Sequence, residues 1–313
     1  MLESAQCLTI AGTATVFPLR LRLHYKAARA AGVSSQTMNK PYTKYYENLK
    51  DFEELLAFGE VFSNSLIGTK PNNTNEVYGE RIFVKLLCHG MTLVKISPSQ
   101  HRKNNRELWD ISSVYAIARA LIETFDAMSY IALSGGSESQ NEFRLLFWKL
   151  HAEARRLDML NKIGSSHPQI DKVQDDISAL QKQVLNHSCI NTCSKQVVVG
   201  VENGKYQPYH LTQRERNEES GVNHEYHNAV TMHLSSHVHT HPFSVHQIIE
   251  FKAGNEECIG LMGIALQYSS SFLAKAISGM QQLFPACDPK INESTISLIK
   301  QWVRIAENGI RNY

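Results

Sequence analysis

The sequence predicts an all-α protein, a bundle of about seven or eight helices with one long helical hairpin and at most one small β-hairpin. Apolar residues recur at three- to five-residue spacing through most of the chain from Tyr42 onward, which is the period of amphipathic helices. Clusters of Pro, Gly, Asn and Ser interrupt this period and mark the connections. With 313 residues, 42% of them hydrophobic, the chain is long enough to bury a substantial core.

Residues 1–40 do not follow the helical period. Small and β-branched residues there lead into a basic stretch from Arg20 to Arg29. We expect a loosely attached N-terminal extension, followed by a single helical domain over residues 41–313. No basic residue precedes the apolar part of this segment, and no apolar run in the chain reaches the length of a membrane span. The expected location is therefore the cytoplasm, with no membrane as a partner.

The first half of the helical domain is expected to open with three helices. The first begins at Tyr42 and ends at the loop Gly68–Asn75, and the second covers Glu76–Lys95. A polar, basic loop at 97–105 separates the second helix from the third, which covers Leu108–Leu133. The third helix is the most apolar of the chain, as expected for a helix in the middle of a bundle.

Two longer amphipathic helices follow, over Ser139–Lys162 and Gln169–His187. Only the short connection Gly164–Pro168 joins them, so they should be antiparallel neighbours and form a helical hairpin over 139–187. On the second helix, apolar residues alternate four and three apart, as in a coiled coil: Val173, Ile177, Leu180 and Val184. This seam is a candidate surface for a second copy of the chain or for a partner protein.

The C-terminal half is expected to begin with the one β element. Ser194–Leu211 is rich in valine and tyrosine and contains Asn203-Gly204, a pair that favours a tight hairpin turn. A polar loop is expected at Thr212–Gly221, and then a helix over His224–His239 that Asn223 caps. The last two helices are expected over Glu257–Phe284 and Glu293–Glu307.

The composition excludes several classes of function. Lys and Arg number 32 and Asp and Glu 30, so the net charge of +2 gives no signal for DNA or for a membrane surface. The sequence contains no phosphate-binding P-loop, no dinucleotide fingerprint and no serine nucleophile in a strand–turn–helix context. Six scattered cysteines indicate free thiols in a reducing compartment rather than a disulfide framework. We therefore expect no bound cofactor.

The most unusual stretch is the histidine-dense run from His224 to His246, which holds seven of the fourteen histidines. His233 and His237 are four residues apart on one helix face, as two metal ligands would be. The general-base glutamate of a zinc protease is missing between them, so the favoured interpretation assigns no metal to the run, or at most these two rings. His237, His239 and His241 alternate where the helix ends, and we expect their rings to diverge.

A second candidate is the charged stripe of Arg119, Glu123 and Asp126 on the apolar third helix. Burying unpaired charge is costly, so these groups must be paired or face a cleft. We favour an internal salt-bridge network that orients neighbouring helices. The functional alternative is that Arg119 faces the histidine helix and binds an anion such as a phosphodiester. A third candidate is Arg144 with His151, whose simpler interpretation is an exposed pair on an amphipathic helix.

Two segments carry a resemblance to known proteins. Ser113–Tyr130 contains R-A-L-I-E at Arg119–Glu123, and Tyr226–Ser244 contains L-S-S-H-V-H at Leu234–His239. The pairing resembles a family of largely helical microbial proteins in which an R-x-L-x-E helix precedes a distant Y-x-x-L-S-x-x-V-H-x-x-P helix. That family is similar to HEPN-type domains (higher eukaryotes and prokaryotes nucleotide-binding).

The resemblance implies a metal-independent ribonuclease of a toxin–antitoxin or antiviral defence system, acting on RNA as a homodimer. Arg119 and His239 are then the catalytic pair, with Glu123 and His237 beside them. The histidine would move the proton of the attacking 2′-hydroxyl, and the arginine would stabilise the charge that develops on the phosphate.

The sequence departs from the HEPN pattern in one respect. Active members carry Arg and His four to six residues apart on one helix, with a polar residue after the Arg. Here Arg144 and His151 enclose six residues, but Leu145 follows the Arg. Two alternatives therefore stay open. One is a non-catalytic helical interaction or scaffold module that uses the hairpin seam. The other is a metal-binding protein that uses His233 and His237.

Overall fold

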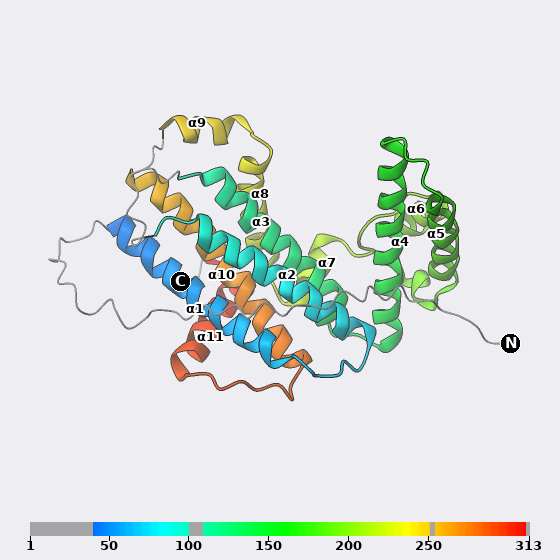
Figure 1. The fold of residues 1–313 in the computed structure, drawn as a ribbon, viewed down its shortest axis with the longest axis horizontal. Helices are drawn as coiled ribbons and strands as arrows, with labels where there is room; N and C mark the ends of the chain where they lie inside the picture. The colour runs from blue at the N-terminus through cyan, green and yellow to red at the C-terminus, as the bar shows by residue number, and fades with distance from the viewer. Residues whose placement is uncertain (1–39, 100–108, 251–253, 311–313) are drawn as a thin grey trace. The chain divides into compact units, whose positions relative to one another are not determined.

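The fold is entirely helical over the residues that the computed structural model describes, 40–99, 109–250 and 254–310 (Figure 1). The α-helices are α1 Lys40–Ser65, α2 Thr74–Ile96, α3 Ile111–Met128, α4 Glu138–Lys162, α5 Gln169–Asn186, α6 Lys195–Glu202, α7 Gln213–Ser220, α8 His224–Val238, α9 Pro242–Glu250, α10 Glu256–Leu283 and α11 Glu293–Asn308. A π-helical turn, η1 Ser129–Leu133, extends α3, and a 3₁₀ turn, η2 Ser188–Thr192, follows α5. The all-α class is confirmed. The expected extension over residues 1–40 lies outside these ranges, apart from its last residue.

The predicted count of seven or eight helices was wrong, because the described residues form eleven. The predicted β-hairpin at Ser194–Leu211 was wrong, because this segment forms α6 followed by irregular chain without a strand. The Ser194 side chain caps its first turn by accepting a hydrogen bond from the Val197 amide, and Val201 is buried. Gly204 has φ +71° and follows the last turn, so the Asn203-Gly204 pair ends a helix rather than turning a hairpin.

Two more short helices replace expected loops. The polar segment before the histidine run is α7, and it begins with a capping box in which Thr212 and Glu215 satisfy each other's backbone amides. Beyond the end of α8, Pro242 begins α9 instead of only ending the preceding helix. Both helices flank α8 in the chain, and the histidine run extends from α8 into α9. Among the described residues, no helix combines the length and the apolarity that crossing a bilayer requires.

The larger hydrophobic core forms around α3 and α10. α3 packs on α2, α8 and α10, and α10 also packs on α1 and α11. Phe272 of α10 is fully buried, and its ring contacts those of Phe125 on α3 and Tyr226 on α8. The expectation that the third predicted helix lies in the middle of the bundle is therefore confirmed.

A second hydrophobic cluster lies in the helical hairpin of α4 and α5. Val173, Ile177 and Val184 of the predicted seam are buried together with Phe143 and Phe147 of α4. Leu180 is partly buried against the same cluster. The hydrophobic face that suggested a partner or a second copy is thus covered by the chain's own α4.

A polar junction connects the two clusters, and we define it by Tyr130, His210, Arg144 and Glu219. The Tyr130 hydroxyl of η1 lies 2.7 Å from His210 Nδ1, and the imidazole packs against the ring of Phe143. Arg144 of α4 is buried and forms a 2.8 Å ion pair with Glu219 of α7. Burial, and next the positive charge of Arg144, lower the pKa of His210 from 6.5 to about 4. The ring is therefore neutral near pH 7, and its Nδ1 can accept a hydrogen bond from the Tyr130 hydroxyl.

His210 should make the protein less stable in mild acid. Because its pKa is lowered on folding, the unfolded chain takes up the proton first, and stability is lost as the pH falls from about 6.5 towards 4. The loss should be on the order of 3 kcal/mol. His210→Asn, which keeps an acceptor for Tyr130 but does not titrate, should reduce the pH dependence of urea unfolding in this range. Parallel stability curves for the two proteins would contradict this account.

Candidate functional site

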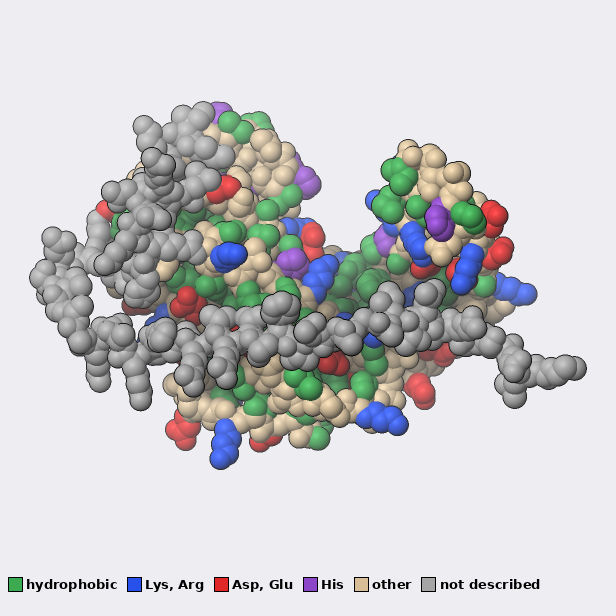
Figure 2. Space-filling model, in the orientation of Figure 1, with side chains coloured by type: hydrophobic (Ala, Val, Ile, Leu, Met, Phe, Trp, Pro, Cys, Tyr) green, Lys and Arg blue, Asp and Glu red, His purple; other side chains and the backbone are tan. Residues whose placement is uncertain are grey.

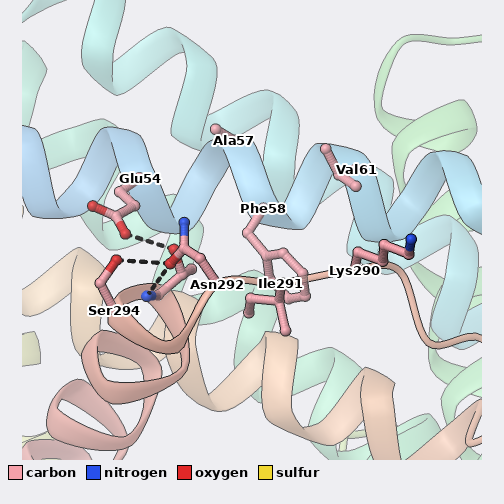
Figure 3. Close-up of a pocket in the computed structure, with 9 residues that line it drawn as sticks. Glu54, Ala57, Phe58, Val61, Lys290, Ile291, Asn292 and Ser294 are labelled. Atoms are coloured by element: carbon pink, nitrogen blue, oxygen red, sulfur yellow. Dashed lines mark hydrogen bonds between the residues drawn. The ribbon is translucent and has the colours of Figure 1, made fainter.

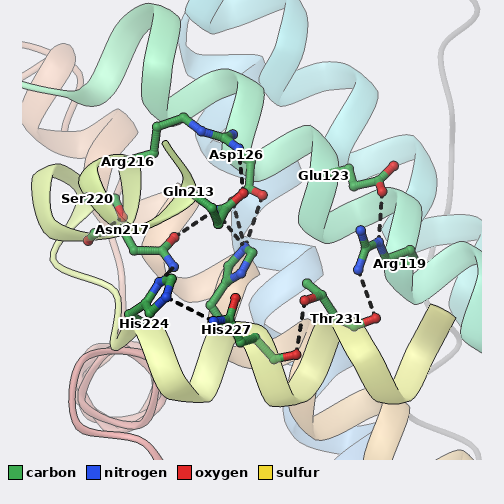
Figure 4. A network of polar contacts seen from close by, with 11 residues as sticks. Arg119, Glu123, Asp126, Gln213, Arg216, Asn217, Ser220, His224, His227 and Thr231 are labelled. Atoms are coloured by element: carbon green, nitrogen blue, oxygen red, sulfur yellow. Dashed lines mark hydrogen bonds and ion pairs between the residues drawn. The ribbon is translucent and has the colours of Figure 1, made fainter. Parts of the chain in front are cut away.

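The candidate site is a set of polar contacts where α3 faces α7 and α8 (Figure 4). We call it the polar seam and define it by Arg119, Glu123 and Asp126 of α3, Gln213 of α7, and His227 and Thr231 of α8. The three α3 residues form one stripe because they are spaced four and three apart. α3 and α8 run antiparallel, since Asp126 contacts the start of α8 and Arg119 contacts its middle.

Arg119 holds α3 to the backbone of α8. Its Nε donates to Glu123 Oε1 at 2.8 Å, and its Nη1 donates to the Thr231 carbonyl oxygen at 2.9 Å. The Arg119 side chain is 26% exposed and that of Glu123 is 58% exposed. Glu123 therefore forms a mostly solvated ion pair, whereas the bond to Thr231 joins two helices.

Asp126 and His227 form the buried end of the polar seam. His227 Nε2 lies 3.0 and 3.1 Å from the two carboxylate oxygens of Asp126, and the side chains are only 3% and 12% exposed. Gln213 Nε2 lies 3.3 Å from the same ring nitrogen. Nδ1 of His227 is buried and has no hydrogen-bond partner among the described residues. A ring so enclosed can orient helices, but it cannot reach a large substrate.

α7 closes this end of the seam. Asn217 is buried, and its Nδ2 lies 3.1 Å from His224 Nδ1. Gln213 Nε2 donates a hydrogen bond to Asn217 Oδ1 at 2.9 Å. The guanidinium of Arg216 stacks on the Tyr209 ring, 3.9 Å from its centroid, and also contacts Gln213. The first histidine of the run is thereby part of the packing between α7 and α8.

His233 and His237 each contact the side chains of neighbouring helices. Both rings meet the ring of Tyr115 edge-on, at centroid distances of 5.1 and 4.4 Å. His237 Nε2 bonds to Gln247 Oε1 of α9 at 2.8 Å, and His233 Nδ1 lies 3.5 Å from the Tyr268 hydroxyl. Burial lowers the pKa of both histidines, which favours their neutral forms. In the described part of the chain, no group of three or more His, Cys, Asp or Glu residues is arranged to hold a metal.

His239 lies apart from Arg119. It follows the last residue of α8 and is exposed, whereas Arg119 bonds to Thr231, eight positions earlier in the same helix. Eight residues span about 12 Å along an α-helix. Among the described residues, the hydrogen-bond partners of Arg119 are Glu123 and Thr231, and His239 is not one of them. The proposed catalytic pair is therefore not assembled in this arrangement.

The two residues of the third candidate pair, Arg144 and His151, bond to different neighbours. The simpler interpretation as an exposed pair was wrong, because Arg144 is 3% exposed and bonds to Glu219 and to the Ser134 carbonyl oxygen. His151 Nδ1 lies 2.9 Å from the Tyr206 carbonyl oxygen. Both residues connect α4 to neighbouring segments, and neither contacts the other.

A shallow pocket of about 370 Å³ lies between α1 and the start of α11 (Figure 3). Its polar groups other than Lys290 bond to one another. The Thr295 hydroxyl donates to Glu54 at 2.6 Å, and Asn292 accepts from the Thr295 amide at 2.7 Å as the cap of α11. These bonds account for its polar side chains as the start of a helix rather than as a ligand site.

Comparison of the chain with protein-family models, curated proteins and solved structures gave no match. The resemblance to HEPN domains therefore stays a proposal. Sequence reasoning found the α3 stripe but not its partners. His227 could have been found, because it lies three and seven residues before the apolar Val230 and Leu234 and so shares their buried face. Gln213 could not, since its segment was expected to be a loop.

Replacing Asp126 should destabilise the protein far more than replacing Glu123. Asp126→Ala leaves the buried His227 without its charged partner, and we expect a loss of about 1.5–3 kcal/mol in the free energy of unfolding. Glu123→Ala removes a solvated ion pair, which contributes about 0–1 kcal/mol. Urea unfolding of the two variants measures both values, and equal losses would contradict the structural role of the Asp126–His227 pair.

Proposed function

We propose that this chain is a non-catalytic helical interaction module. The observation that carries the proposal is that two candidate catalytic residues, Arg119 and His237, and the Asp126 carboxylate of the same α3 stripe are bonded within the molecule. Arg119 bonds to the backbone of α8, Asp126 bonds to His227, and His237 bonds to Gln247. A catalytic group must reach the reacting atoms, and these three already hold one helix against another.

The contact surface that we propose is the turn from α8 to α9. Val238, Phe243 and Val245 are 42%, 55% and 38% exposed there, although large apolar side chains are usually buried. Figure 2 shows apolar and histidine side chains on the surface in this part of the molecule, near the top of the view. Exposed apolar groups that gather in one place mark contact surfaces.

We take the partner to be a second copy of the chain. A two-fold symmetric contact places each surface against itself, so the surface must not repel itself. No Asp, Glu, Lys or Arg occurs between Tyr226 and Ile249, so two copies of this turn can meet without like-charge repulsion. This contact replaces the hairpin seam, which α4 covers.

Phe243→Asp should weaken self-association, because it puts a charge where two copies would bury a phenyl ring. We expect the dimer dissociation constant to rise about tenfold or more. Light scattering and sedimentation over a concentration series measure it. Ile67→Asp is the matched control, since Ile67 is 76% exposed in the distant loop after α1. A wild type that stays monomeric at the highest concentration, or equal effects of both variants, would reject the contact.

The second candidate function is the HEPN-like ribonuclease. It is favoured by the exposed ring of His239, which has no hydrogen bond to the described residues, and by the part-exposed guanidinium of Arg119. This candidate requires α8 to move relative to Arg119 when RNA binds. The interaction module requires no such movement.

RNA cleavage in EDTA separates the two candidates. If the chain is a ribonuclease, the cleavage rate should fall about 10²- to 10⁴-fold in each variant. His239→Ala removes proton transfer, and Arg119→Ala removes charge stabilisation. The exposed His246 on α9 provides a control variant, His246→Ala, which should cleave like wild type. No cleavage by wild type, or the same rate in all four proteins, would exclude the catalytic candidate.

A further inference from the structure

The turn that ends α8 has an unusual residue at its centre. Thr240 has φ +52° and is the non-glycine residue with positive φ among the described residues. The amide of Thr240 bonds to the His237 carbonyl at 3.4 Å, and the amide of His241 bonds to the Ser236 carbonyl at 3.0 Å. These two bonds define a Schellman motif, in which the left-handed position is normally glycine.

A β-branched residue in this position is strained. The left-handed conformation costs an ordinary residue about 1–2 kcal/mol, and bulky or branched residues adopt it rarely. Such strain is found most often at functional sites, where the surrounding structure holds it. The residues on either side of Thr240 are His239 and His241, so the strained turn determines how these two rings are placed.

The turn brings the two rings together, contrary to the expected divergence. The imidazole centroids of His239 and His241 are 5.8 Å apart, and the ring planes are inclined by only 30°. A helix that continued would have put these alternate side chains about 200° apart around its axis. The reversal at Thr240 instead turns both rings to the same side.

This spacing is close to that of two histidines on one metal ion. With Zn–N bonds of 2.0–2.1 Å and tetrahedral angles, the centroids of two ligating rings lie about 5 Å apart. Both residues are exposed, so their side chains can rotate to direct one nitrogen of each ring at a shared ion. Neither ring is hydrogen-bonded to a described residue, and no Lys or Arg occurs in the chain between Tyr226 and Ile249 to repel a cation.

We propose that His239 and His241 chelate one divalent transition-metal ion, with Cu²⁺ bound most tightly and Zn²⁺ and Ni²⁺ less tightly. Imidazole nitrogen suits these three ions, and the order follows the general affinity of nitrogen ligands for them. The pair supplies two ligands, and the other coordination positions stay open to water or to an external donor. The site differs from the His233 and His237 pair, whose rings are held by Tyr268 and Gln247.

Titration with Cu²⁺, followed by calorimetry and by electron paramagnetic resonance, tests the site in the full chain. We expect one tight ion with two coordinated imidazole nitrogens. His239→Ala and His241→Ala should each raise the dissociation constant of that ion at least about tenfold, because a single ring cannot chelate it. The double variant should bind the ion at least as weakly as either single variant, since it also removes the one imidazole ligand that a single variant keeps.

The controls separate this site from the other histidines. His246→Ala and His167→Ala also remove an exposed imidazole, and both should bind the tight ion like wild type. Thr240→Gly keeps the turn without its strain and should retain the ion. Unchanged Cu²⁺ affinity in His239→Ala or His241→Ala would overturn the proposal, as would an equal loss in His246→Ala. Melting curves of the metal-free variants verify that each variant is folded.

Discussion

The packing of α3 against α2, α8 and α10 depends on neutralising the charged stripe on an otherwise apolar helix. Asp126 is nearly buried, and a carboxylate left unpaired there would strongly destabilise the fold. His227 supplies the partner, and Arg119 adds a bond to the backbone of α8 at the other end of the stripe. The histidine helix is thereby aligned antiparallel to α3, and this alignment brings His233 and His237 against Tyr115. The positions of α7 and α9 follow, because both contact α8.

The long helices could be predicted from the sequence, because each buries one continuous apolar face and ends at Gly, Pro or Asn. The bounds of α2, α4, α5, α10 and α11 lie within two residues of the expected ones. The short helices could not be predicted. The run of valines in α6 is typical of a strand. The features that favour a helix are the N-terminal cap by Ser194 and the left-handed Gly204 after its last turn. In α7 almost every side chain is polar, so no apolar period marks it, and its capping box is the local signal.

The candidate site was predictable only in part. The spacing of the α3 stripe implied internal partners, and the structure supplies them from α7 and α8. The identity of those partners depends on which residues of distant helices face each other, and a single sequence does not contain that information. The histidine run shows the same limit. The helical positions of His233 and His237 indicated packing. The closeness of the His239 and His241 rings follows from the left-handed backbone conformation of Thr240, which the periodicity of the sequence does not reveal.

The polar junction has a consequence for how the protein opens. The cluster of α4 and α5 and the core around α3 are separate hydrophobic units, and the Tyr130–His210 and Arg144–Glu219 contacts lie between them. Cooperative units of this kind unfold together only when the contacts between them are strong. Amide hydrogen exchange would then report one unfolding unit at neutral pH. In mild acid, where His210 takes up a proton once the junction opens, the hairpin amides would exchange through a separate opening while those of α3 and α10 stay protected.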